Sequence, residues 1–149
     1  MNEREIDRRL GEFESLCRDQ GLPLTVQRRD ILRAVLERDD HPTVDQIFES
    51  VRGRIPGLSR TTVYRVLETL CQLGVLRRLH HPGASVRFDG KVNRHHHLIC
   101  RLCHKVVDVE SKKLDSVSLT PSQRRGFVVE DFTVHFHGIC SESKAKEAT

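Results

Sequence analysis

The stretch RFDGKVNRHHHLICRLCHKVVD, residues 87–108, stands where a helical pattern in the chain gives way to an alternating one. Alternation of side chains along an extended segment would place His95 and His97 on one face and His96 on the other. Two imidazoles would then lie side by side on a strand. The potential metal ligands of this stretch are Asp89, His95, His96, His97, Cys100, Cys103, His104 and Asp108. Such a density of ligands predicts metal binding.

Two kinds of ligand are present in this stretch. Cys100 and Cys103 form a C-x2-C pair, the spacing at which two thiolates bind one tetrahedral zinc ion from a tight turn. The histidines and aspartates offer nitrogen and oxygen donors, which suit other divalent metals. We therefore predict two sites with different metal preferences. Cys17 falls on the apolar face of a predicted helix, and we expect it to be a buried apolar residue instead.

Before residue 75, the spacing of apolar side chains predicts four helices. The first contains Ile6 to Cys17 and ends before Gly21, and Thr25 can cap the second. Thr43 and Gln46 form a capping box for the third helix. The fourth begins after Ser59, and Gly74 supplies its stop.

The fourth helix is followed by VLRRLHH, PGAS and VRFD, residues 75–89, which predict two short strands and the turn between them. Helices followed by such a hairpin make a winged helix-turn-helix, whose last helix enters the major groove of DNA. Residues 52–78 hold six arginines against the single acid Glu68, which favours phosphate contacts over an ordinary solvated surface. The expected DNA-contacting residues are Arg60, Thr61, Thr62, Tyr64 and Arg65.

We predict an α+β protein with a winged-helix domain at 1–90 and a smaller α/β domain at 91–149. HLIC, KVVDVE and FTVHFHGIC have strand patterns, and Pro121 can begin a short helix before Gly126. A segment of this size buries little core alone, so we expect a second copy to pair with it across a continued sheet. The polar tail SESKAKEAT is expected to fray.

Bulk properties limit the class of protein. No apolar run in the 149 residues suits a membrane span, and the N-terminus has no apolar signal core, so we expect a cytoplasmic protein without membrane contact. An odd number of cysteines, five, fits a reducing compartment better than a disulfide framework. A net charge of +4 permits a polyanionic partner.

The chain resembles the ferric uptake regulator family of bacterial metalloregulators. The blocks that carry the resemblance follow in the right order: GLPLTVQRRDILRAVL, HPTVDQIF, LSRTTVYRVLETLCQLGVLRRL, VRFDG, HHHLICRLCHKVVDVE and HFHGIC. The resemblance implies a homodimeric, metal-dependent repressor that binds palindromic operators. It also implies that Tyr64 and Arg65 lie on the DNA-contacting helix and that residues 91–149 form the dimerisation domain.

The resemblance assigns a regulatory metal site to His41, Asp89, His95, His97 and Asp108. Three imidazoles and two carboxylates suit Fe(II), Mn(II) or Zn(II). His41 and Asp89 belong to the DNA-binding half and the other three to the second half, so a metal ion would clamp the two domains at one angle.

The resemblance also implies a second C-x2-C pair, but Cys140 is followed by Ser143 where a fourth cysteine would stand. A serine hydroxyl is a poor zinc ligand because it does not ionise as a thiol does. Three outcomes stay open: a Cys100, Cys103 and Cys140 site completed by water or histidine, a lost site, or free cysteines. We favour a weakened or absent structural zinc. His135 and His137 are either further ligands or an exposed sheet face.

Aspartate at both carboxylate positions resembles the peroxide-responsive branch of the family, which implies that peroxide oxidises His41 or His95 in the iron form. The alternative is a plain iron or zinc uptake regulator. Two other classes are less favoured. CRLCH matches a c-type haem attachment motif, which requires export. A zinc hydrolase could use the histidines and aspartates, but we find no substrate-positioning motif and expect no enzymatic activity.

Overall fold

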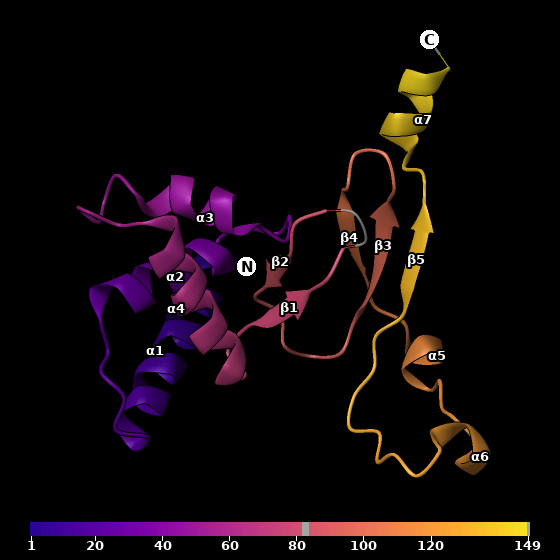
Figure 1. The fold of residues 1–149 in the computed structure, drawn as a ribbon, viewed down its shortest axis with the longest axis horizontal. Coiled ribbons are helices and arrows are strands. Elements are labelled where there is room, and N and C mark those ends of the chain that lie inside the picture. The colour runs from indigo at the N-terminus through magenta and orange to yellow at the C-terminus, as the bar shows by residue number, and fades with distance from the viewer. Residues whose placement is uncertain (82–83, 149) are drawn as a thin grey trace. The chain divides into compact units, whose positions relative to one another are not determined.

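The computed structural model describes residues 1–81 and 84–148, and its chain divides into two compact units, Met1–Val92 and Asn93–Thr149 (Figure 1). Within these described residues, the first unit contains four helices and a two-stranded sheet, and the second contains a three-stranded sheet and three short helices. Mixed helices and small sheets confirm the predicted α+β class. Among the described residues, no helix is long and apolar enough to cross a membrane.

Three of the four helices of the first unit begin at the residues that the sequence predicts. The side chains of Thr25 and Ser59 accept hydrogen bonds from backbone N–H groups in the first turns of their helices. Thr43 and Gln46 form the expected reciprocal capping box. The four helices are α1 (Glu3–Asp19), α2 (Val26–Leu36), α3 (Val44–Val51) and α4 (Arg60–Gln72).

One hydrophobic core holds these four helices together. From α1 it takes the predicted face that includes Phe13 and Cys17, which confirms that Cys17 is a buried apolar residue. The predicted apolar face of α4 supplies Val63, Leu67 and Leu70. Gly74 follows α4 with φ +72°, a left-handed conformation that ends a helix without steric cost when the residue is glycine.

The predicted hairpin is present in the described residues as β1 (Arg77–Leu79) and β2 (Arg87–Asp89), which pair antiparallel. Residues 82 and 83 of the predicted PGAS turn lie outside the described residues. The guanidinium of Arg9, on α1, donates to the carbonyls of Val75 and Gly90 at 2.8 and 2.7 Å. Arg9 thereby ties α1 to the segments that lead into and out of the hairpin.

The second unit is built on a sheet of strand order β4-β3-β5. The central strand β3 (His96–Cys100) pairs antiparallel with β4 (Val106–Val109) and parallel with β5 (His135–Gly138). A parallel connection needs a crossover, and residues 110–134 supply it with two single-turn helices, α5 (Lys112–Asp115) and α6 (Pro121–Arg124). Pro121 occupies the first turn of α6, as predicted.

Two features of the second unit differ from the sequence-based expectation. The tail predicted to fray forms α7 (Ser141–Glu147), because the Cys140 side chain caps it and Glu142 complements its N-terminal dipole. Lys105 adds an ion pair to Glu142 at 2.7 Å. The helix α5 was not predicted, and the Ser111 side chain caps it.

Candidate metal sites and DNA-contacting helix

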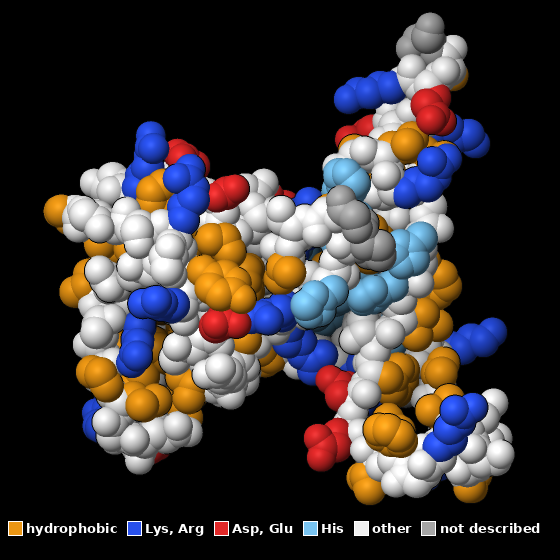
Figure 2. Space-filling model, in the orientation of Figure 1, with side chains coloured by type: hydrophobic (Ala, Val, Ile, Leu, Met, Phe, Trp, Pro, Cys, Tyr) orange, Lys and Arg blue, Asp and Glu red, His pale blue; other side chains and the backbone are white. Residues whose placement is uncertain are grey.

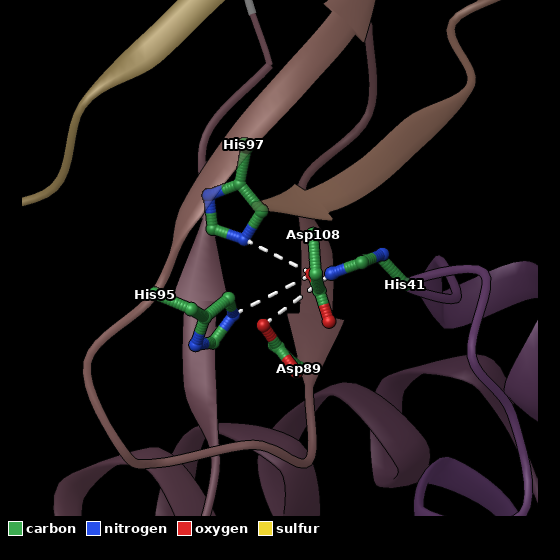
Figure 3. A group of neighbouring side chains, drawn as sticks. All are labelled: His41, Asp89, His95, His97 and Asp108. Atoms are coloured by element: carbon green, nitrogen blue, oxygen red, sulfur yellow. Dashed lines mark ion pairs between the residues drawn. The ribbon is translucent and has the colours of Figure 1, made fainter. Parts of the chain in front are cut away.

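In the first unit, a loop between α2 and α3 carries His41 beside Asp89. The loop pairs with β2, since the N–H of Phe88 donates to the Pro42 carbonyl at 2.9 Å and Thr43 forms a bridge with Arg87. The guanidinium of Arg87 also donates to the His41 carbonyl at 3.0 Å. As a result, Nε2 of His41 lies 3.4 Å from Oδ2 of Asp89 (Figure 3).

The backbone of His41 has φ +53°, in the left-handed region that few residues other than glycine adopt. Such a conformation costs about 1 kcal/mol or more and persists only where the surroundings impose it. The hydrogen bonds from Phe88 and Arg87 to the loop impose it here. His104 and Arg125 also have positive φ, so the conformation shows that the loop is held by its neighbours and does not by itself assign a role to the imidazole.

In the second unit, β3 and β4 bring two imidazoles to one carboxylate. His97 pairs with Asp108 in the sheet register, and His95 immediately precedes β3. Nε2 of His95 and Nε2 of His97 lie 3.5 and 3.6 Å from Oδ1 of Asp108 (Figure 3). Both imidazoles are buried, and their ring centroids are 4.8 Å apart.

The orientation of the His95 ring is fixed by a second contact. Nδ1 of His95 lies 2.8 Å from the carbonyl of Asn93, so this nitrogen must carry the proton. In the neutral imidazole the lone pair is then on Nε2, which faces Asp108. Metal-ligating histidines generally donate their other ring N–H to a carbonyl or carboxylate in this way. His95 is therefore in the tautomer that a metal ion requires.

His96 lies on the opposite face of β3, as side-chain alternation predicts. Its Nδ1 accepts the N–H of Val134 at 3.0 Å, so the proton is on Nε2, which lies 2.9 Å from Asp115. The ring is fully buried. His96 thus connects β3 to α5 and to the segment before β5, and its lone pair is already used within the protein.

The three predicted cysteines come together with Ser143 at the end of the sheet where α7 begins. Sγ of Cys103 and Sγ of Cys140 are 3.6 Å apart. Oγ of Ser143 lies 3.6 Å from Sγ of Cys100 and 3.3 Å from Sγ of Cys140. Tetrahedral zinc binds thiolates at about 2.3 Å, which sets sulfur atoms roughly 3.8 Å apart. The cluster therefore has the size of a zinc site with three sulfur corners and an oxygen at the fourth.

The surroundings of the cluster favour thiolates. Hydrogen bonds from the backbone of Cys103 and Cys140, and one with the Ser143 side chain, lower the pKa of Cys100 to about 5. The side chain and then the backbone N–H of Ser143 lower the pKa of Cys140. Thiolates are the form that binds metal, so the cluster of Cys100, Cys103 and Cys140 suits a soft or borderline cation.

The predicted DNA-contacting residues share the first two turns of α4. Thr61, Tyr64 and Arg65 are exposed, whereas Thr62 is half-buried and its N–H is capped by Ser59. Arg60 is exposed too, but its guanidinium lies 2.8 Å from Asp45 and over the ring of Phe48 on α3. Arg60 therefore also fixes α4 against α3, a contact that the sequence did not predict.

Other residues that position these sites were missed from the sequence. Arg87 and Asn93 act through backbone contacts made by the fold, and no motif marks them. The sequence marks Ser143 only as a missing ligand, although its hydroxyl and N–H both contact the sulfur atom of Cys140.

Comparison with known proteins identifies the family. The sequence profile described as the Ferric uptake regulator family matches residues 19–137. The chain belongs to the Ferric uptake regulator family. Among its relatives is the peroxide-responsive repressor PerR of Staphylococcus epidermidis, 32% identical over 93% of both chains. The peroxide operon regulator of Bacillus subtilis is 34% identical over 93% of this chain and 95% of that protein.

A solved structure supports the fold assignment. The ferric uptake regulator Fur of Helicobacter pylori matches with a TM-score of 0.78 over 93% of both chains, at 18% identity. At this identity the likeness shows the fold alone. It confirms that the α+β architecture of the chain is that of the Ferric uptake regulator family.

The fourth corner of the cysteine cluster should set how firmly it holds zinc. We expect the protein to lose zinc from the cluster during dialysis against a chelator, because a neutral hydroxyl binds zinc more weakly than a thiolate. The variant Ser143→Cys should retain about one zinc ion per chain, since four thiolates form a closed structural site. Elemental analysis after dialysis measures both.

Ser143→Ala serves as the matched control and should retain no more zinc than the unmodified chain. Firm retention by the unmodified chain that also requires Cys100, Cys103 and Cys140 would overturn the expectation of a weakened site.

Proposed function

We propose that the protein is a metal-dependent, DNA-binding transcriptional repressor that acts as a homodimer and responds to peroxide. The observation that carries the proposal is the arrangement of histidine around aspartate in both units: His41 beside Asp89 in one, and His95 and His97 beside Asp108 in the other. Membership of the Ferric uptake regulator family supports a regulatory role for a metal ion bound by these donors.

We infer that all five donors bind one divalent metal ion. Three imidazole nitrogens and two carboxylates suit Fe(II), Mn(II) and Zn(II), and the tautomer of His95 supports ligation through Nε2. The ion would be shared between Met1–Val92 and Asn93–Thr149. Its binding energy then favours whichever relative placement of the units brings the donors together, which is how metal and DNA binding become coupled.

DNA binding is assigned to the first unit. The exposed side chains of Tyr64 and Arg65 follow a capped N-terminus on α4, the position from which a recognition helix reads the major groove. Arginine suits this role because its planar guanidinium bonds guanine or phosphate with two hydrogen bonds.

The homodimer is supported by an apolar row across the sheet of the second unit. Val107, Leu98 and Phe136 are neighbours in the register of β4, β3 and β5, and each is more than 40% exposed. Phe127 and Val128 are still more exposed, and Figure 2 shows apolar side chains around α5 and α6. A second copy would cover this surface and pair with the edge strand β5, because a two-fold axis brings identical strands together antiparallel.

Peroxide sensitivity is supported by the peroxide-responsive repressors among the relatives and by aspartate at both carboxylate positions. Bound ferrous iron would supply the electron that reduces peroxide, which Mn(II) supplies less readily and Zn(II) does not supply. Among the proposed ligands of this ion, the imidazoles of His41 and His95 are the groups that we expect to be oxidised. Oxidation replaces a ring C–H by C–O while peroxide is reduced to water, and the oxidised ring is a poorer ligand.

Arg65→Ala tests the DNA-binding helix. Loss of a bidentate base contact should cost about 1–3 kcal/mol, or roughly 5-fold to 150-fold in Kd, while the dimer persists. Gel shifts on an AT-rich palindromic duplex, with and without Mn(II), measure the affinity and its metal dependence. Arg18→Ala, an exposed arginine on α1, is the matched control. Unchanged affinity in the Arg65 variant would refute the assignment of α4.

Leu98→Glu tests the dimer surface. A charge in the middle of the apolar row should dissociate the dimer, because burying an unpaired carboxylate is costly. Sedimentation equilibrium measures the change, and Leu24→Glu places the same charge on a comparably exposed leucine of the first unit. If the dimer persists in the Leu98→Glu variant, the apolar row is not the interface. Dissociation by Leu24→Glu instead would place the interface in the first unit.

Peroxide sensing is tested by mass spectrometry of peptides that contain His41 and His95. Equal peroxide doses are given to iron-loaded and manganese-loaded protein. We expect a gain of one oxygen atom on either histidine, with loss of DNA binding, in the iron form alone. Unmodified histidines in both forms would leave a plain iron or zinc regulator that releases DNA when the metal dissociates.

A further inference from the structure

A row of imidazoles continues from the His95 and His97 pair onto β5. The register pairs His97 with His135 and Ile99 with His137, so both β5 histidines share the sheet face of His97. Ring centroids lie 5.3 Å apart between His97 and His135 and 6.3 Å apart between His135 and His137. Each ring is thus next to the following one.

Exposure rises along this row. His95 is 1% and His97 is 5% exposed, His135 is half-buried, and His137 is exposed. Figure 2 shows histidine side chains at the surface over the strands of this unit. The row therefore connects solvent to the buried nitrogen atoms that face Asp108, and it does so within the second unit alone.

Imidazole nitrogen binds divalent first-row transition metals, and two histidines at i and i+2 on a strand point the same way. Two protein donors leave the remaining positions of an ion to water, which makes a weak site from which metal leaves readily. A weak surface site of this kind speeds the filling of a buried set of ligands. Capture of an ion at the surface raises its local concentration beside the next ligand. The chain carries a net charge of +4, which otherwise disfavours cations near it.

We propose that His135 and His137 form an outer, exchangeable site for divalent transition-metal ions, from which the ion passes by way of His97 to the donors around Asp108. The delivery step rests on the proposed regulatory metal site. The outer site itself does not. His97 belongs to both groups, as its ring contacts those of His95 and His135.

The delivery step is tested by the rate at which Co(II) fills the buried site. Stopped-flow absorption of the d–d bands follows nitrogen and oxygen ligation, while sulfur charge-transfer bands report the cysteine cluster separately. His137→Asn and His135→Asn should each slow filling at least threefold at limiting Co(II) and leave the final absorbance unchanged. His80→Asn makes the same change at an exposed histidine of the first unit and should leave the rate unchanged. Equal rates in all four proteins would overturn the delivery role.

The outer site is tested where the buried one is disabled. In the double variant His95→Ala, Asp108→Asn, we expect Co(II) to give a weak, readily reversed d–d absorption that disappears when His137→Asn is added. Absence of that absorption would refute the outer site. Failure of the unmodified protein to take up Co(II) at nitrogen and oxygen ligands would instead refute the proposed regulatory site, and the two failures are therefore distinguishable.

Discussion

The alternation of side chains along β3 is the constraint on which the second unit depends. The central strand β3 has functional or structural side chains on both of its faces. One face presents His97 next to His95 and Asp108, and the other holds His96 between Asp115 and the Val134 backbone. A slip of one residue in this strand would exchange the two faces, so that the ligand would become a structural residue and the structural residue a ligand. The contacts of His96 with α5 and with Val134 oppose such a slip.

In the first unit, backbone pairing has the corresponding role. The hydrogen bond from Phe88 to Pro42 and the Thr43–Arg87 bridge extend the hairpin by a short segment, and this brings a loop histidine to a strand aspartate. His41 itself belongs to no helix or strand. Its position is fixed by the backbone pairing of its neighbours Pro42 and Thr43 with β2. The capping box of α3, which begins at Thr43, fixes the other end of the loop.

Local patterns explain which parts of the structure the sequence could predict. Caps at Thr25, Thr43 and Ser59, the apolar faces of α1 and α4 and the alternation of His95 to His97 depend on residues near one another in the chain. The proximity of His41 to Asp89 could not be derived locally and came only from family resemblance. The parallel pairing of β3 with β5 and the position of Ser143 among the sulfur atoms also depend on long-range contacts. The helix α7 was missed because a polar segment with no apolar face gives no periodic signal, and its cap is a cysteine, a residue not normally expected in that position.

The left-handed backbone of His41 lowers the free energy of unfolding of the protein. Glycine or asparagine adopts this conformation more easily, so either would relieve the backbone cost, while removing a buried imidazole that lies beside Asp89. Neither residue can replace the imidazole as a metal ligand. At position 41 the backbone conformation therefore favours one kind of residue and metal ligation requires another, so relief of the strain is obtained only with loss of the ligand.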